Sequence, residues 1–466
     1  MLNRLIQKEI RQILLDFRFL TIFAICVALT VLSVYVGIQS YTRLLEQHNV
    51  VADMNQKFMH QSLVEDGNLW DLRRRGYPWS RRPEVLGTLV FGLAGSLGQE
   101  VHIQYQRLAF FQDSLFAVDP VHALFGVLDF GFVVKVILSF CALLLTYDAV
   151  CGEKEAGTLR IAASFSVPRT TLTLAKLAGS SIAVLLPLMV AFLVAGIVLS
   201  ATSSLHLGAD EWLRILFLLG IFGIYITIWT GFGIWISSLT HSRITAFLGL
   251  LGLWTLWIFV IPNVALSAAQ WWVPVTSIYD VQQQALAARG ETRKKMDMDL
   301  DAYWRQNGSG WDSLPENRRQ ELLMGSAEIR KKWDAVFYRR LTDLQAERQN
   351  QLGQRQDVAM MLSSLSPFSA TTLCAMDFAR TGPVQQRHME EALQAYLIYM
   401  SRFIQDQGVL RAEDRKLADF AWFSYKPSEP LADCIARSVP YFLNLALLAL
   451  LGFAGAYVTI LRYDVR

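Results

Sequence analysis

Six long apolar runs divide this 466-residue chain, and they constrain its fold more than any other feature. Each run is about 20 residues long, enough for a helix to cross a hydrocarbon core of about 30 Å. Runs of this length indicate helices, because a helix satisfies all of its backbone polar groups inside lipid. The runs cover residues 19–39, 130–147, 177–201, 212–239, 244–265 and 438–461. They predict an all-α polytopic membrane protein with six transmembrane helices.

The composition supports this class and excludes others. Hydrophobic residues make up 53% of the chain and charged residues 18%, whereas a soluble protein of this length normally carries more charge. The formal net charge of +3 is too small to indicate a nucleic-acid partner. The five cysteines lack the spacing of a metal site. Cys374 and Cys434 could pair in an oxidising compartment, and two unpaired thiols are the alternative.

Positive residues in the short connecting segments predict the orientation in the membrane. Lys and Arg occur in the N-terminal segment, in residues 148–176, in the turn before residue 244 and in residues 462–466. The short segment between the third and fourth runs instead carries Asp210 and Glu211. We therefore expect both termini in the cytoplasm. The two long segments, residues 40–129 and 270–437, are then extracytoplasmic insertions.

The first 18 residues have the pattern of an amphipathic helix. Apolar residues recur there at helical spacing: Leu2, Leu5, Ile6, Ile10, Ile13, Leu14 and Phe17. Arg4, Lys8 and Arg11 occupy the more polar positions between them. This pattern predicts a helix that lies in the plane of the cytoplasmic membrane interface and contacts lipids. The alternative is a plain basic segment that only sets the orientation.

The second insertion is predicted to be mainly helical. Apolar stripes of helical period occur within residues 326–344 and 384–407, each with a polar opposite face. Gly308 and the Gly382-Pro383 pair are expected to separate helices. Packing of these stripes against each other is a simpler explanation than a ligand site. The extracytoplasmic domain is thus expected to be helical rather than a sheet.

Residues 148–176 form a charged segment between the second and third apolar runs. Gly152 and Gly157 have the spacing of a phosphate-binding loop, but Thr158 stands where such a loop needs Lys. Nucleotide binding by this chain is therefore excluded, and its sequence shows no catalytic motif either.

The apolar runs show no buried carboxylate, and Lys135 in the second run is expected to snorkel to the headgroups. Energy for any uphill transport should come from another subunit.

The charged segment resembles a signature of ABC-2 type transporter permeases. Its residues Gly152 to Leu159 read Gly-Glu-Lys-Glu-Ala-Gly-Thr-Leu, and Val167-Pro168-Arg169 precedes the third apolar run. Six spans, internal termini and an amphipathic helix before the first span also match that family. The two large insertions, with Leu365-Ser366-Pro367-Phe368 late in the second, are similar to a bacterial subgroup that includes gliding-motility-type permeases.

The resemblance implies a non-catalytic membrane subunit of an ATP-driven exporter in the bacterial inner membrane. A coupling helix in the charged segment would dock on a separate ABC ATPase, present in two copies, which binds ATP and Mg²⁺. This chain would hold no cofactor, and a second permease chain, identical or related, would complete the complex. The implied coupling residues are Glu153, Lys154, Glu155, Gly157, Thr158, Leu159, Arg160, Pro168 and Arg169.

Two other functions remain open at this stage. ATP hydrolysis could drive a mechanical or scaffolding complex that signals to extracytoplasmic partners without moving a substrate. An intramembrane enzyme is the third possibility, but the sequence offers no catalytic constellation for it. The identity of an exported substrate does not follow from the sequence.

Overall fold

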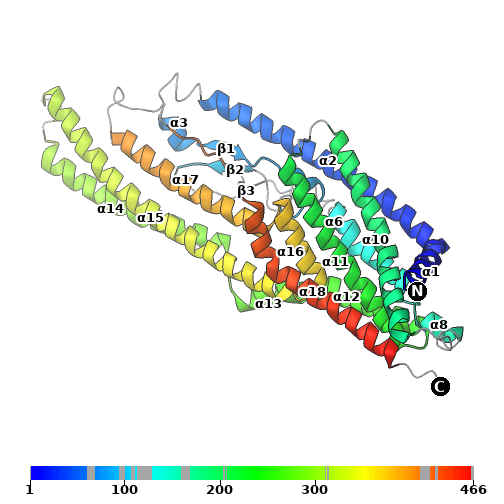
Figure 1. Ribbon diagram of the computed structural model, residues 1–466. Coiled ribbons are helices and arrows are strands. Elements are labelled where there is room, and N and C mark those ends of the chain that lie inside the picture. Colours follow the sequence, from blue (N-terminus) through cyan, green and yellow to red (C-terminus); the bar gives the residue numbers. More distant parts are fainter. Residues whose placement is uncertain are drawn as a thin grey trace.

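The structure is a computed structural model that describes residues 2–59, 69–93, 100–105, 111–112, 128–158, 168–202, 205, 207–309, 311, 314–409, 420–425 and 429–462. It consists of a helical bundle and a long helical arm that projects from one end of it (Figure 1). The start of α1 (Leu2–Leu14) and the end of α18 (Leu431–Leu461) lie at the opposite end of the bundle, beside α8 (Cys151–Glu155). These two ends are called the arm end and the α8 end below.

Six helical segments within the described residues are long and apolar enough to cross a membrane, which confirms the predicted class. They are Phe17–Phe58, Phe130–Glu155, Arg169–Ala201, Ala209–Leu239, Arg243–Trp272 and Leu431–Leu461. Several extend well beyond the apolar runs, because polar helical turns continue them outside the hydrocarbon region. The bundle contains α1 (Leu2–Leu14), α2 (Phe17–Met59), α6 (Phe130–Phe132), α7 (Ser139–Thr146), α10 (Arg169–Ala201), α11 (Ala209–Leu239), α12 (Arg243–Thr255), α13 (Ile261–Trp272), α16 (Pro367–Ala379) and α18 (Leu431–Leu461).

Helix α11 is the centre of the bundle. Its side chains Phe222, Tyr225 and Trp229 are fully buried, and α7, α10, α16 and α18 all contact this helix. Gly231 of α11 and Gly452 of α18 face each other, and a Cβ added to Gly452 would lie 3.2 Å from backbone atoms of α11. Such close backbone approach is the usual way in which transmembrane helices gain packing contacts.

Two spans contain a π-helical segment, η3 (Val133–Leu138) in the second and η4 (Leu256–Val260) in the fifth. Carbonyl groups there accept hydrogen bonds from other helices: Tyr225 Oη donates to Lys135 O at 2.7 Å, and Ser366 Oγ donates to Trp257 O. A π turn disturbs the regular backbone ladder and is frequent at functional sites. Here the two π segments are where other helices attach by hydrogen bonds.

Helix α16, which belongs to the predicted insertion of residues 270–437, packs into the bundle. Its residues Ala370, Cys374 and Phe378 are buried in the same apolar core as the spans. Ser366 and Pro367, which belong to the Leu-Ser-Pro segment, begin this helix: Ser366 Oγ accepts a hydrogen bond from the Phe368 N–H. Its thirteen residues are too few to span a bilayer, so hydropathy alone does not place it there.

Lys135 does not snorkel as predicted. The side chain is 7% exposed, because α16 covers it. Its Nζ atom donates to Thr372 Oγ1 at 3.0 Å and lies 5.2 Å from the centre of the Phe368 ring. The lysine therefore joins the second span to α16, and its charge is stabilised by a hydroxyl group and an aromatic face.

Arg214 joins three helices of the bundle at the arm end. This side chain on α11 is 0% exposed, and its Nε atom donates to Asp210 Oδ2 at 2.7 Å. The other guanidinium nitrogens donate to Phe378 O at the end of α16 and to Glu429 O before α18. A buried arginine is stable only when its donors are satisfied, so this contact set fixes three helices relative to one another.

The arm is built around a long helical hairpin (Figure 1). It consists of α14 (Ile278–Asn307) and α15 (Glu316–Ser363), and the 48 residues of α15 extend over about 72 Å. Helix α17 (Pro383–Val409) packs on α15 and buries Leu393, Leu397 and Met400. Both predicted apolar stripes are therefore helical, and the breaks at Gly308 and Gly382 are confirmed.

A small antiparallel sheet completes the arm. Its strands are β1 (Tyr77–Ser80), β2 (Glu100–Ile103) and β3 (Phe111–Gln112), in the order β1-β2-β3. Tyr77 pairs with Ile103, and both side chains join the apolar cluster of α17. The short helix α3 (Leu69–Arg74) precedes the sheet and adds Leu72 to this cluster. The predicted mainly helical domain thus contains one small sheet.

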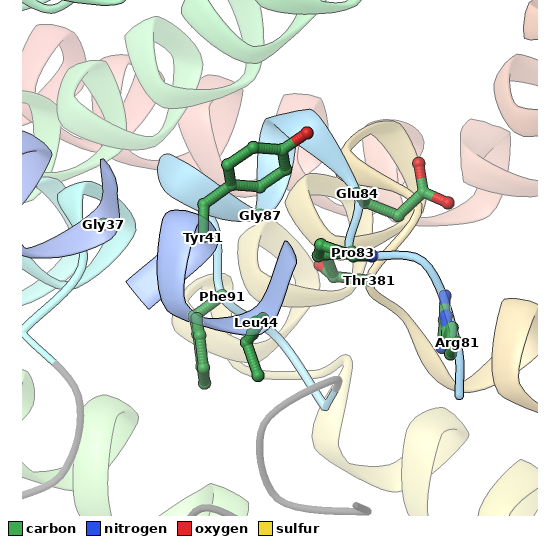
Figure 2. A pocket seen from close by; sticks show the side chains of 9 residues that line it. All are labelled: Gly37, Tyr41, Leu44, Arg81, Pro83, Glu84, Gly87, Phe91 and Thr381. Carbon is green, nitrogen blue, oxygen red and sulfur yellow. The ribbon is translucent and has the colours of Figure 1, made fainter. Parts of the chain in front are cut away.

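Helix α2 makes a close contact with the short helix η2 (Val85–Thr88). Figure 2 shows Tyr41 and Leu44 of α2 at a small pocket that also includes Phe91 and Glu84. The pocket has a volume of about 20 Å³, which is room for one water molecule. At Gly37, also on this pocket, the backbone of η2 touches α2 so closely that a side chain does not fit.

We predict that Gly37→Ala destabilises the protein. The added Cβ would lie 2.1 Å from Thr88 O, a backbone atom that cannot rotate away. The free energy of unfolding should fall by about 1–3 kcal/mol, the usual cost of overpacking. Gly252→Ala is the matched control, because no atom of the described residues lies within 4 Å of its Cβ position. Thermal unfolding in detergent, followed by labelling of the buried cysteines, measures both. Equal stability of the two variants would contradict the close contact.

Candidate functional site

Helix α8 is a short helix held at one end of the bundle by a side-chain cap. Ser237 Oγ of α11 accepts hydrogen bonds from the N–H groups of Val150 and Cys151, both at 3.0 Å. These are N–H groups that a helix N-terminus leaves without an intrahelical partner. At the other end, Gly157 has φ +72°, a left-handed conformation that favours glycine and ends the helix. The sequence thus determines both the start and the end of α8.

Lys176 connects α8 to two other helices. Its Nζ atom lies 2.7 Å from Glu153 Oε1 of α8 and 3.5 Å from Glu9 Oε2 of α1, and it donates to Ala149 O at 3.0 Å. Lys176 is 4% exposed and Glu9 is 6% exposed. Two carboxylates around one ammonium group form a buried ion triad, called the Lys176 triad below. It joins α1, α8 and α10 through charge-assisted hydrogen bonds.

The other charged residues of α8 contact the turn between α11 and α12. The guanidinium of Arg243 lies 3.2 Å from Glu155 Oε2, and the Arg243 N–H donates to Glu155 Oε1 at 2.8 Å. Lys154 Nζ donates to the carbonyl oxygens of Ser238 and Thr240. Helix α8 is therefore attached to the ends of the fourth and fifth spans as well as to α10.

The connection between α1 and α2 is bound to the same region. Arg18 donates to Asp16 Oδ2 at 3.0 Å, to Tyr147 Oη at 3.3 Å and to Asp148 Oδ2 at 3.1 Å. Although burial acts to raise the pKa of the Asp16 carboxyl, the hydrogen bonds from Arg18 hold this pKa below its ordinary value. The Asp16 carboxylate is thus stabilised in its charged form, and Arg18 links it to Asp148 just before α8.

These elements surround a polar cleft of about 330 Å³ at the α8 end. Four carboxylates line it, from Glu9, Asp16, Asp148 and Glu153, together with three basic side chains. Each carboxylate has a basic partner within the chain. On α8 and the turn after it, three residues near this cleft are exposed: Glu155, Ala156 and Thr158, which we call the docking face. Ion pairs within the chain therefore hold the charged walls of this cleft in place.

The structure brings most of the predicted coupling residues together. Glu153, Lys154 and Glu155 lie on α8, and Gly157 and Thr158 follow it. Pro168 caps α10, and Arg169 donates to Leu461 O at 3.4 Å. Leu159 and Arg160 lie outside the described residues. The coupling role of all nine residues stays a prediction.

The predicted amphipathic helix is present as α1. Its basic residues Arg4, Lys8 and Arg11 are all exposed, whereas Glu9 faces α10. A Cβ added to Gly179 of α10 would lie 2.7 Å from Glu9 Cβ, so the two helices are in close contact. In the sequence, Lys176 and Arg243 are among the basic residues that predict the orientation, and the pattern does not single out Glu9 or Ser237. An acidic residue among the basic ones of α1 was the available signal.

The remaining predictions concern cysteines and metals. Cys374 and Cys434 are free and buried, which is the unpaired alternative of the two considered. Cys434 Sγ accepts a hydrogen bond from Arg214 at 3.4 Å. Among the residues that the structure describes, no three His, Cys, Asp or Glu side chains are grouped to hold a metal ion.

We predict that Lys176→Met lowers the free energy of unfolding by about 3–5 kcal/mol, because Glu153 loses its cation and the buried Glu9 keeps only the exposed Lys8 as a partner. Thermal unfolding in detergent measures the effect. Lys8→Met is the matched control, since its side chain is 58% exposed. Replacing Glu9 and Glu153 by Gln in the Lys176→Met background should restore most of the lost stability. A Lys176→Met protein as stable as Lys8→Met would show that the triad does not hold α1 and α8 together.

Comparison with known proteins agrees with this geometry. The family model described as ABC-2 family transporter protein matches residues 4–464, nearly the whole chain. A search of curated proteins yields no match. The matched region includes α1, α8, all six spans and the arm. The chain belongs to the ABC-2 family of transporter membrane proteins.

Proposed function

We propose that this chain is the permease subunit of an ATP-driven exporter and that α8 couples it to a separate ABC ATPase. The observation that carries the proposal is the attachment of α8 to α10, α11 and α12 directly and to α1 through Lys176. A helix fixed in this way cannot move without displacing the spans to which it is bound. ATP and Mg²⁺ would be bound by the ATPase, and this chain would supply no catalytic group.

The internal ion pairs change the role proposed for the two glutamates. Glu153 and Glu155 already have Lys176 and Arg243 as partners, so they are not free to pair with basic residues of an ATPase. They instead transmit force from α8 to α10 and to the turn between α11 and α12. The docking face, Glu155, Ala156 and Thr158, would contact the ATPase. Movement of packed helices around such a contact is a common gating motion.

The complex is proposed to contain two permease chains, identical or related, and two ATPase subunits. In the fifth and sixth candidate spans, only 17% of the most apolar window is buried within the chain, against 61% in the fourth. These faces are available to a second permease chain and to membrane lipids. We place the protein in the bacterial inner membrane with both termini and α8 in the cytoplasm, as the charge distribution favours.

The arm supports a second candidate function. A hairpin of about 72 Å is long enough to reach partners well beyond the membrane surface. ATP hydrolysis could move this arm and act mechanically on such partners without any substrate crossing the bilayer. Reconstituted complexes distinguish the two functions. ATP-dependent loss of a cargo from one side indicates export, and ATP-dependent arm movement without flux indicates the mechanical function.

We predict that the docking face and the arm lie on opposite sides of the membrane. Ala156→Cys should react with a membrane-impermeant maleimide only after cells are permeabilised, and Met298→Cys on α14 should react in intact cells. The five native cysteines are buried, so they give a low background. Met298 is 71% exposed, which makes its position accessible to the reagent. Labelling of both variants in intact cells would contradict the proposed orientation.

We predict that Ala156→Arg and Thr158→Arg together weaken ATPase binding without unfolding the permease. Co-purification of the ATPase and ATP-dependent activity should fall roughly tenfold, as when contacts worth about 1.4 kcal/mol are lost. Thermal stability of the isolated permease should be unchanged, because both positions are exposed. Ala287→Arg, at an exposed position on α14, is the control and should leave co-purification intact. Normal ATPase recruitment by the double variant would exclude the docking face as the contact surface.

A further inference from the structure

Helix α1 presents its basic residues on a side that no other part of the bundle covers. Arg4, Lys8 and Arg11 are all exposed, and their spacing of four and three residues places them on one side of the helix. These three residues are called the basic face below. Glu9, the one acidic residue of α1, is instead turned inward to Lys176. The exposed side of α1 therefore carries positive charge without a carboxylate beside it on the helix surface.

Contacts with two spans place α1 at the edge of the membrane. Its last residue, Leu14, lies directly before the first candidate span, which begins at Phe17. A Cβ added to Gly179 of α10 would lie 2.7 Å from Glu9 Cβ and 3.3 Å from Ile6 O. Helix α1 thus packs against the third span close to residue 177, where the apolar run of that span begins. Figure 1 shows α1 at the edge of the bundle, beside the start of α2. The basic face therefore lies at the depth of lipid headgroups.

An exposed leucine continues the basic face toward the first span. The Leu15 N–H donates to Arg11 O at 3.0 Å, so the helical turn extends past α1 and Leu15 lies one turn beyond Arg11. Leu15 is 85% exposed, and Phe17 and Leu20 are 74% and 62% exposed. Apolar side chains that are exposed beside a span are stable at the boundary of the acyl chains. The order along this side, first basic and then apolar, matches the order from headgroup to acyl chain in a phospholipid.

These apolar residues decide between lipid and an acidic protein surface as the partner of the basic face. Both partners carry the negative charge that arginine and lysine select. A soluble acidic protein, however, would leave Leu15 and Phe17 in water, where exposed apolar surface is unfavourable. A phospholipid covers the basic and the apolar residues with one molecule. The observations therefore favour lipid as the partner.

We propose that the basic face of α1 binds the phosphate groups of anionic phospholipids in the leaflet at the α8 end, with acyl chains against Leu15 and Phe17. Arginine forms paired hydrogen bonds with phosphate oxygens, and several cations at one membrane surface favour lipids with a net negative charge. Since Glu9 on the inner side of the same helix belongs to the Lys176 triad, bound lipid holds α1 in the position that the triad requires. The site depends neither on an exported cargo nor on coupling to an ATPase.

Native mass spectrometry of the delipidated full-length protein tests the charge preference. Dioleoyl-phosphatidylglycerol is titrated against dioleoyl-phosphatidylcholine, which has the same acyl chains and no net charge. We expect phosphatidylglycerol to bind about tenfold more tightly, since each cation near an anionic headgroup adds to the affinity. Arg4→Gln combined with Arg11→Gln should remove most of this preference. This double variant keeps Lys8, which also pairs with Glu9, so the inner side of α1 is left unchanged.

The matched control removes the same charge from the arm. Arg289→Gln combined with Arg305→Gln, at exposed positions on α14, should bind both lipids like the unmodified protein. Equal binding of the two lipids by the unmodified protein would overturn the proposal, as would an equal loss of preference in both double variants. An unchanged lipid preference in the α1 variant, together with loss of ATPase co-purification, would assign the basic face to the ATPase instead.

A spin label tests the depth of this region without changing the basic face. Leu15→Cys is labelled with a nitroxide, which the five buried native cysteines permit, and reconstituted in vesicles of equal parts phosphatidylglycerol and phosphatidylcholine. Collisions with oxygen, which concentrates in hydrocarbon, should exceed collisions with a nickel chelate dissolved in water. Met298→Cys, at an exposed position on the arm, is the control and should show the reverse order. A label at position 15 that collides mainly with the nickel chelate would overturn the proposal.

Discussion

The ammonium group of Lys176, buried between two glutamates, is the interaction on which the α8 end of this protein depends. A lone charge at this depth would be too costly, and two carboxylates without the lysine would repel each other. Each member of the triad therefore requires the other two. Because Glu9, Glu153 and Lys176 come from three different helices, the electrostatic requirement determines their relative positions. A short five-residue helix becomes a rigid part of the bundle as a result.

The arm end is held by a different kind of contact. Arg214 satisfies its donors mainly with backbone carbonyls at helix ends, so it fixes where α16 ends and α18 begins. Lys135 fixes the middle of α16 to the second span through Thr372. Both cations lie in helices that hydropathy identifies as membrane spans, and both have partners from the segment between the fifth and sixth spans. The arm is therefore anchored in the bundle by polar contacts as well as by apolar packing.

Local patterns in the sequence predict much of this architecture. The six spans, α1, and the helices α15 and α17 follow from hydropathy and helical period, because each pattern depends on neighbouring residues. The partners of charged residues do not follow in this way: Glu9 and Lys176 are 167 positions apart. For the same reason the sequence does not predict the partners of Glu153 and Glu155 within the chain, or the contact of Lys135 with α16. The packing of α16 against the spans is not predicted either, because thirteen residues give no membrane-spanning signal.

The π segments in the second and fifth spans affect how side chains are assigned to helix faces. A π turn contains one residue more than an α turn, which rotates everything beyond it by about 100°. A helical wheel drawn from residues at the α8 end of either span therefore assigns the residues beyond the π segment to the wrong face. The π segments are residues 133–138 and 256–260. The residues that face one neighbouring helix therefore follow one helical period before the π segment and a shifted period after it. Any comparison of lining residues between the two ends of these spans has to be made separately for each half.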